Sequence, residues 1–176
     1  RIHLRKNLPI GGGVGGGSSD AAATIAGLLA VWGVEAPSSL IQASGVLGAD
    51  VPVCLAYQLG QGSLFWIEGS GKDIPPHPVE GGGSFPILLV NPGISILTPL
   101  VFKHYKESSA LFSEPVEWDG KDLIAFCQKT RNDLTAFAIA QLPLIKEILA
   151  FIQAQEGCFF SRLSGSGGTC YGLFTS

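Results

Sequence analysis

The sequence predicts an α+β protein with a mostly antiparallel sheet. Short apolar runs typical of strands alternate irregularly with helical patterns, and no strand-helix-strand unit repeats. The last two expected strands are separated only by a glycine-rich turn, which favours antiparallel pairing. Hydrophobic residues make up 46% and charged residues 14% of the 176 residues, a composition that allows a sizeable buried core and disfavours disorder.

The chain is expected to begin with a strand, a glycine loop and a helix. Residues 2–5 alternate apolar and polar side chains like a half-buried strand. Six glycines lie between Gly11 and Gly17 and predict a loop that permits unusual backbone angles. After Ser18 and Ser19, the run 21–31 is apolar nearly all round and predicts a buried helix.

A second helix is expected to start with Ser38 or Ser39 as its N-cap and to end by Gly48. Pro52 disfavours helix at the preceding residue, which predicts that Asp50 lies on a turn. Short strands are expected at 53–57 and 63–67. The Pro- and Gly-rich stretch 72–83 suggests a domain boundary.

The second half is expected to contain a buried strand at 85–90 and then a short helix. Thr98 and Pro99 offer an N-cap and a proline at the first helical position. Further expected elements are helices near 119–127, 133–140 and 143–155 and strands at 159–163 and 169–174, with Gly157 ending the last helix.

Composition excludes several functional classes. The formal net charge is −3 without a basic run, so neither nucleic acid nor an anionic membrane is an expected partner. The longest apolar stretch, 21–34, is shorter than the roughly 20 residues of a bilayer span. The histidines (His3, His77 and His104) and the four widely spaced cysteines show no metal-ligand spacing, so we expect no metal site and free thiols.

The glycine run is a candidate phosphate site. Without side chains, backbone N–H groups of a loop and helix N-terminus can surround phosphate oxygens. Ser18 and Ser19 add hydroxyls suited to a phosphate oxygen or Mg²⁺, and Lys6 could add a positive charge.

A flexible glycine hinge is the alternative interpretation of the glycine run. A Walker A loop is excluded because its Gly-Lys-Ser/Thr is missing, and a dinucleotide fingerprint is disfavoured because 39–43, where it requires an acidic residue on a strand, has a helical pattern.

Residues 9–22, Pro-Ile-Gly-Gly-Gly-Val-Gly-Gly-Gly-Ser-Ser-Asp-Ala-Ala, closely resemble the ATP loop of the GHMP kinases. Further matches to this family are Leu47 to Pro52, Asn91 to Gly93 with Thr98 to Phe102, Asn132 to Leu134, and Leu163 to Gly167. The resemblance therefore spans nearly the whole chain.

The resemblance implies two α+β domains, one like domain 2 of ribosomal protein S5 and one ferredoxin-like. We expect residues 1–80 to be the remainder of the ATP-binding domain and residues 81–176 to be the substrate-side domain. Since the chain lacks Met and starts at Arg1, we also expect the natural N-terminal part, with the lysine that the family pairs with its catalytic aspartate, to be missing. A chain of these residues alone would then be poorly active.

The implied activity is transfer of the ATP γ-phosphoryl group, with Mg²⁺ bound to ATP, to an alcohol. The closest resemblance is to the branch that phosphorylates the 2-hydroxyl of 4-diphosphocytidyl-2-C-methyl-D-erythritol in non-mevalonate isoprenoid synthesis, in bacterial cytosol or a plastid. The partner is thus a cytidine diphosphate-linked sugar alcohol, and an oligomer is not readable from the sequence. Another acceptor, such as homoserine or a mevalonate-type alcohol, and a non-catalytic nucleotide-binding protein remain alternatives.

Residue by residue, Asp50 matches the catalytic aspartate, although a lone Asp on a turn is also a common capping residue. Thr98 and Phe102 match positions of the cytidine pocket, with core packing as the alternative for Phe102. Gly165, Ser166 and Gly167 match a motif that backs the phosphate loop, and a tight hairpin is compatible with that role. The residues expected at ATP are Lys6, Pro9, Gly11, Gly12, Gly13, Gly15, Gly16, Gly17, Ser18 and Ser19.

Overall fold

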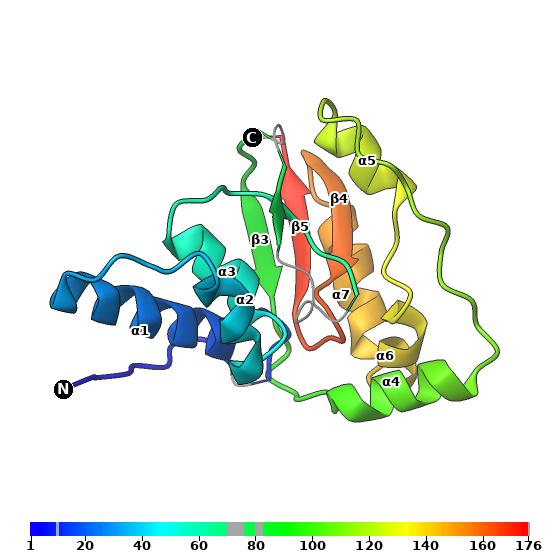
Figure 1. Cartoon of the computed structure of the whole chain (residues 1–176). Helices are drawn as coiled ribbons and strands as arrows, with labels where there is room; N and C mark the ends of the chain where they lie inside the picture. The colour runs from blue at the N-terminus through cyan, green and yellow to red at the C-terminus, as the bar shows by residue number, and fades with distance from the viewer. Residues whose placement is uncertain (10, 70–75, 80–82, 176) are drawn as a thin grey trace. The chain divides into compact units, whose positions relative to one another are not determined.

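The computed structural model describes residues 1–9, 11–69, 76–79 and 83–175. The chain forms two compact units, one made of Arg1–Lys6 and Gly15–Gly81 and the other of Asn7–Val14 and Gly82–Ser176 (Figure 1). Both contain helices and strands, and within the described ranges every strand pair is antiparallel. The α+β prediction is therefore confirmed. The boundary expected between residues 80 and 81, and most of the Gly81–Gly83 loop, lie outside the described residues.

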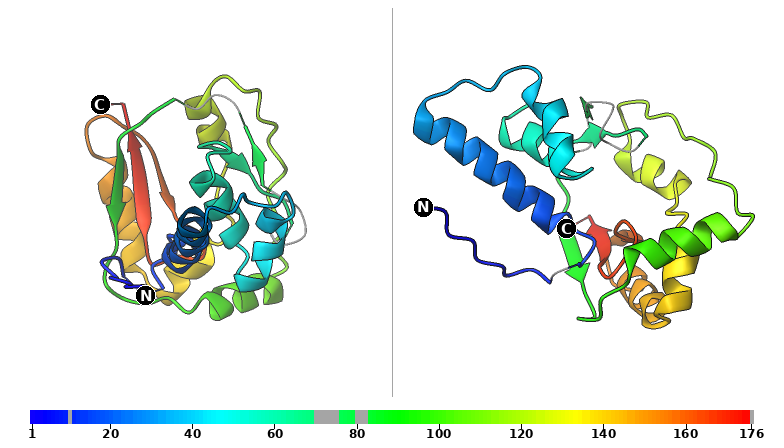
Figure 2. Two further views of the ribbon diagram at one scale, coloured as in Figure 1. Left: turned by 60° about the vertical axis from the view of Figure 1, so that its left-hand side comes forward. Right: turned by 60° about the horizontal axis from the view of Figure 1, so that its bottom comes forward.

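The first unit is a small helical cluster with a two-stranded ribbon. Helix α1 packs against α3, and α2 also contacts α3 (Figure 2). Their shared core consists of Ala22, Ile41, Leu55 and Ala56. The elements are α1 (Gly16–Trp32), α2 (Leu40–Ala43), the 3-10 helix η1 (Ser44–Leu47), α3 (Val51–Gln58), β1 (Phe65–Trp66) and β2 (His77–Pro78).

Helix α3 corrects the strand predicted at 53–57. Short apolar runs do not distinguish a strand from a buried helix by periodicity. Pro52 lies in the first helical turn, where its missing N–H costs no hydrogen bond, and helix therefore begins at Val51. The face with Leu55 and Ala56 is fully buried. Of the neighbouring predictions, 63–67 contains β1, and the helix expected from Ser39 is present as α2 followed by η1.

Two expectations near the N-terminus are wrong. Residues 2–5 form no strand, because no described segment pairs with their backbone, and Ile2 and Leu4 are exposed. Helix α1 begins at Gly16, shortly before the start expected at Ser18 and Ser19, but its stretch 21–31 is not buried as predicted. Ala22 is the one residue of α1 that is fully buried. Val31 and Trp32 at its C-terminal end are mostly exposed.

The second unit is built on a three-stranded sheet in the order β3-β5-β4. Helix α7 packs on β4 and β5, and α4 contacts α6 (Figures 1 and 2). In the register, Leu88 pairs with Gly172 and Ser161 pairs with Gly172 from the other side. The elements are β3 (Ile87–Val90), α4 (Thr98–Glu107), α5 (Leu123–Lys129), α6 (Thr135–Gln141), α7 (Leu144–Gln153), β4 (Cys158–Leu163) and β5 (Cys170–Phe174).

The core of the second unit depends on one glycine of the central strand. A Cβ atom at Gly172 would lie 2.4 Å from Cγ2 of Ile152, a fully buried residue of α7. The absent side chain thus lets α7 lie close to the sheet. The remaining buried residues of this core come from α4, α6, α7, β4, β5 and the segment before α4: Ile96, Val101, Ala138, Ile145, Leu163 and Cys170.

The helices and strands expected in this half are all present, with shifted ends. The strand predicted at 85–90 is present, but it is not buried as expected. Its ladder spans only Ile87–Val90, lies at the sheet edge, and leaves Ile87, Leu88 and Leu89 exposed. Apolar composition alone does not distinguish a central strand from an edge strand.

Candidate active site

The glycine run ends in a helix N-terminus that carries no side-chain cap. Gly11, Gly13 and Gly15 have φ values of 72°, 73° and 64°, in the left-handed region that favours glycine. Gly15 occupies the N-cap position of α1, and the first turn of α1 contains no acidic residue. The first N–H groups of a helix have no intrahelical partner and lie at its positive end. This helix start is therefore suited to an anion.

Within the second unit, the run is held against the β4–β5 turn. A Cβ atom on Gly13 would lie 2.5 Å from the carbonyl oxygen of Gly167 and 2.8 Å from that of Ser164. The Ser164 hydroxyl donates to the Gly13 carbonyl at 2.6 Å, and the Thr169 N–H donates to the Gly12 carbonyl at 3.0 Å. These contacts argue against a free glycine hinge at Gly12 and Gly13.

The turn between β4 and β5 is also a tight hairpin. A hairpin role for its glycines is therefore compatible with contact to the glycine run. The Gly167 N–H donates to the Ser164 carbonyl at 3.0 Å, and β4 and β5 pair on either side. Gly165 and Gly167 both have positive φ. The hairpin thus provides the backbone surface that Gly13 contacts.

Two asparagine side chains hydrogen-bond to the β4–β5 turn and to the residues that flank it. Asn132 Nδ2 donates to the carbonyl oxygens of Leu163 and Gly165 at 2.9 and 2.7 Å. Asn91 Nδ2 donates to the Thr169 hydroxyl at 2.9 Å. The family motifs contain both asparagines, but a sequence cannot show which distant backbone an amide will contact. Asn91, Asn132, Ser164 and Thr169 are therefore positioning residues that sequence reasoning did not assign to the site.

The structure brings together Thr98 and Ser166, two residues expected at the substrate. Their hydroxyl oxygens lie 2.6 Å apart. Thr98 begins α4, and Phe102 follows one turn later on the same face. The Phe102 side chain is 46% exposed, which excludes core packing as its role. A hydroxyl pair and an accessible aromatic ring thus occur close to one another in the second unit.

Asp50 occupies the N-cap position of α3, in the first unit. Its side chain makes no capping hydrogen bond and is exposed, so the capping alternative is not realised. Gly48, two residues earlier, has the Ser18 hydroxyl 3.8 Å from the position of a Cβ atom. Burial, followed by the charge of Asp50, raises the pKa of the Cys54 thiol one turn along α3. The first unit thus presents a free carboxylate near the start of α1.

Lys6 already has a partner in this structure. Its ammonium group forms an ion pair with the carboxylate of Asp20 in α1. Both side chains are about one-third exposed, so the pair is accessible to solvent. Lys6 can act on a phosphate only if the anion competes with or joins this carboxylate. Its predicted role stays a prediction.

Other sequence expectations concern metals, membranes and thiols. In the described part of the chain, no three His, Cys, Asp or Glu side chains are grouped as metal ligands, and no helix has the length and apolar character of a membrane span. The four cysteines are free, and burial raises the pKa of Cys170 to about 11. Where the dinucleotide fingerprint would require a strand, the structure has α2.

Comparison with known proteins now identifies the family. The model of the GHMP kinases N terminal domain matches residues 1–57, and that of the GHMP kinases C terminal matches residues 120–176. A relative from Brucella melitensis biotype 1 is 40% identical over 99% of this chain, and one from Chelativorans sp. is 42% identical over 98%. Both are named 4-diphosphocytidyl-2-C-methyl-D-erythritol kinase.

A solved structure agrees with these matches. The crystal structure of a 4-(cytidine 5'-diphospho)-2C-methyl-D-erythritol kinase covers 97% of this chain with a TM-score of 0.71 and 31% identity. The chain spans 60% of that structure, and 58% and 57% of the two relatives. With both family models and the relatives in agreement along its length, the chain belongs to the GHMP kinase family.

Proposed function

We propose that the natural-length protein carrying this chain transfers the γ-phosphoryl group of ATP to the 2-hydroxyl of 4-diphosphocytidyl-2-C-methyl-D-erythritol. The observation that carries this proposal is the match, over nearly the whole chain, to relatives named as this kinase. The reaction belongs to non-mevalonate isoprenoid precursor synthesis, in the cytoplasm of a bacterium or in a plastid.

ATP, as its Mg²⁺ complex, is the proposed ligand of the glycine run. The uncapped N-terminus of α1 and the positive φ values of Gly11, Gly13 and Gly15 support this assignment. The Ser18 and Ser19 hydroxyls follow directly and offer oxygen ligands to a phosphate-bound Mg²⁺. Pro9, Gly12, Gly16, Gly17 and Lys6 complete the proposed ATP-binding set.

Asp50 is the proposed group that accepts the proton of the acceptor hydroxyl. Phosphoryl transfer requires positioning of the attacking oxygen and stabilisation of charge on the moving phosphoryl group. An exposed carboxylate without a capping bond can do the first, and the helix N-terminus can contribute to the second.

Thr98, Phe102 and the turn Gly165-Ser166-Gly167 are the proposed acceptor-side residues. The Phe102 ring is accessible and can stack on a cytosine base. The paired hydroxyls of Thr98 and Ser166 can exchange their mutual hydrogen bond for bonds to the acceptor.

The decisive experiment uses Asp50→Asn in the natural-length protein. We expect turnover, followed as ADP release with the diphosphocytidyl substrate, to fall by about 100-fold or more while ATP affinity is retained. Asp119→Asn, at an exposed turn, is the matched control and should retain wild-type turnover. Unchanged turnover in Asp50→Asn would remove Asp50 from this role.

The acceptor is tested separately with a panel that includes homoserine and mevalonate. We expect kcat/KM to be highest for the diphosphocytidyl compound. A preference for another alcohol would keep the GHMP kinase activity and refute the proposed acceptor. No turnover with any alcohol, together with ATP binding, would favour a non-catalytic nucleotide-binding protein.

A further inference from the structure

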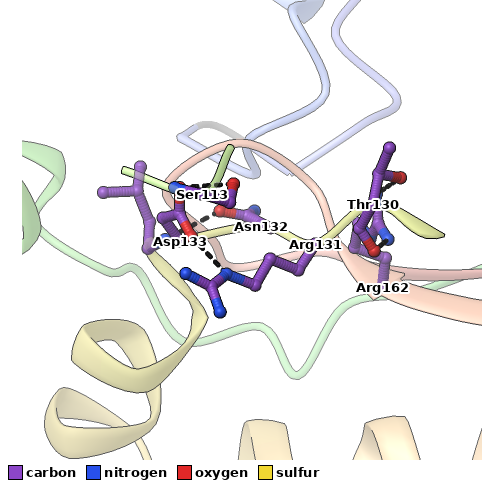
Figure 3. A network of polar contacts seen from close by, with 7 residues as sticks. Ser113, Thr130, Arg131, Asn132, Asp133 and Arg162 are labelled. Carbon is purple, nitrogen blue, oxygen red and sulfur yellow. Dashed lines mark hydrogen bonds and ion pairs between the residues drawn. The ribbon is translucent and has the colours of Figure 1, made fainter. Parts of the chain in front are cut away.

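The second unit contains a cavity that the proposed kinase site does not use. Its volume is about 630 Å³, within the range of small-molecule pockets. The wall is formed by residues from α4, α6, α7 and β4 and by two irregular segments, one after α4 and one before α6. Figure 3 shows the polar network at this location. None of the residues proposed to bind ATP or the acceptor lines it, although the positioning residue Asn132 does.

Tyr105, one of the lining residues, has a buried hydroxyl without a hydrogen-bond partner in the described part of the chain. Tyr105 is only 7% exposed, and its Oη atom has no hydrogen-bond partner among the described residues. Burial, and then the charge of Asp133, raise the pKa of Tyr105, whereas Arg131 acts in the opposite direction. The phenol is therefore protonated and near both charged groups. An occupant with an acceptor oxygen would satisfy this donor, since buried polar groups are normally hydrogen-bonded.

Two guanidinium groups line the same cavity. Arg131 Nε donates to Asp133 at 2.7 Å, which leaves its terminal N–H groups for another acceptor. Arg162 bonds to Thr130 and to the Cys127 carbonyl and lies 4.3 Å from the ring centre of Phe160. In the described part of the chain, no carboxylate pairs with Arg162.

Asp133, the one acidic residue among those that line the cavity, already has hydrogen-bond donors and a positively charged partner. Asp133 accepts hydrogen bonds from the N–H and hydroxyl of Ser113 at 2.8 and 2.9 Å, in addition to Arg131 (Figure 3). Burial would raise the pKa of Asp133, but the bonds from Ser113 and Arg131 lower it on balance. The lining charges therefore sum to a net positive charge, which favours an anion.

The rest of the wall is largely apolar. Side chains from the segment after α4 and from α6 and α7 supply it, and they have no hydrogen-bonding groups to offer a ligand. They are Leu111, Ala136, Phe137, Ile139 and Leu149. A ligand that fills the cavity thus needs a hydrocarbon part as well as an anionic head.

We propose that this cavity binds a small phosphate ester with a short hydrocarbon tail. The phosphate accepts hydrogen bonds from the Tyr105 hydroxyl and from the free terminal N–H groups of Arg131, while the tail packs on the apolar wall. Arg162, whose terminal nitrogens already donate to Thr130 and Cys127, adds positive charge to the lining. A phosphate suits donors from two separate parts of the chain, α4 and the segment before α6, better than a planar carboxylate does, because its oxygens are arranged tetrahedrally.

Isothermal titration calorimetry with butyl phosphate tests the proposal on the 176-residue chain. We expect saturable binding of butyl phosphate, weaker binding of inorganic phosphate and of butyrate, and no binding of 1-butanol. Equal binding of inorganic phosphate and butyl phosphate would overturn the role of the tail. Equal binding of butyrate would overturn the choice of phosphate, and absence of butyl phosphate binding would refute the site.

Two variants locate the binding. Tyr105→Phe removes one oxygen and keeps the ring contacts with Phe112 and Phe137, and Arg131→Gln removes a charge at an exposed side chain. Each should weaken butyl phosphate binding by about tenfold. The matched controls, Tyr57→Phe and Arg5→Gln, change exposed residues of the first unit and should bind like wild type.

Circular dichroism and the thermal midpoint establish that each variant is folded. If Tyr105→Phe and Arg131→Gln are folded and bind butyl phosphate as tightly as wild type, the ligand lies elsewhere and the proposal fails. A crystal of the chain with butyl phosphate gives an independent outcome: density for the phosphate beside Tyr105 Oη supports the site, and density elsewhere refutes it.

Discussion

At Gly13, two requirements for glycine coincide. Its φ is in the left-handed region, and two carbonyl oxygens of the β4–β5 turn occupy the space that a side chain would need. Either condition disfavours other residues, since a left-handed conformation alone costs roughly 1–2 kcal/mol for an L-residue. Gly17, four residues later, has neither requirement because it lies within α1 with open space around it.

The Gly13→Ala substitution should therefore lower the free energy of unfolding by more than about 2 kcal/mol. Urea unfolding followed by circular dichroism measures this change. Gly17→Ala is the control and should leave stability unchanged or raise it by up to about 1 kcal/mol, because alanine favours helix. A Gly13→Ala protein as stable as wild type would mean that the turn does not contact Gly13 as described.

The Asp133 carboxylate makes stability depend on pH. Its pKa is lowered in the folded protein, so its contribution is fully present above the ordinary value of 3.8 and is lost as pH falls through the lower folded pKa. The difference in free energy of unfolding between wild type and Asp133→Asn should be constant above about pH 5 and shrink in more acidic solution. Urea unfolding at a series of pH values checks this, and a difference that grows on acidification would contradict it.

At the residue scale, the glycines and Asp50 could be predicted as site residues from the sequence. The side chains that hydrogen-bond to the glycine loops could not. Glycine clusters signal unusual backbone, and the family resemblance supplied their role. The contacts of Asn132 and Ser164 join positions more than 30 and 150 residues apart. Such contacts depend on the fold and have no local sequence signal.

At the scale of elements, α5 shows how one side chain determines where a helix begins. Asp122 is the N-cap, and its carboxylate accepts the Ala125 N–H at 2.9 Å. No residue of α5 is fully buried, so packing contributes little to holding its first turn. The helix was expected from about residue 119, and this cap explains why it begins at Leu123 instead.

Asp122→Ala should thus destabilise the protein by about 1 kcal/mol, and Asp122→Asn should have a smaller effect because Asn is also a good N-cap. Thermal and urea unfolding measure both. Hydrogen exchange at Ala125 provides a local reading, since this amide loses its partner only in the Ala variant. Equal effects of the two substitutions would indicate that charge, and not capping, is the source.

Helices and strands with a strong local sequence signal were predicted well. Elements whose type depends on packing against other elements were not. Helix α7 has an apolar face and a glycine soon after its end, and β4 and β5 flank a glycine turn. By contrast, α3 has an apolar run that suits a strand equally well. Its helical state depends on Pro52 in the first turn and on packing against α1, which only the tertiary structure reveals.

For the molecule as a whole, the position of β3 at the edge of the sheet formed by the described strands affects behaviour in solution. Strand β3 is an edge strand, and Ile87 is 56% exposed. Unprotected apolar edge strands promote pairing between molecules. Ile87→Lys should reduce self-association of the 176-residue chain at high concentration, measured by light scattering. Val46→Lys, the same kind of apolar-to-lysine change on η1, is the control. If both substitutions reduce self-association equally, the added charge is the cause and pairing through β3 is not supported.

The irregular stretch between α4 and α5 has a practical consequence for labelling. Ser113 is tied to Asp133, whereas the residues that follow, up to Asp122, form no helix or strand and are largely exposed. A protease recognition sequence or a fluorophore placed between Glu114 and Glu117 would leave the Ser113 attachment intact. Trp118, whose ring centre lies 5.3 Å from that of Phe126, would then serve as a built-in energy-transfer donor to that fluorophore.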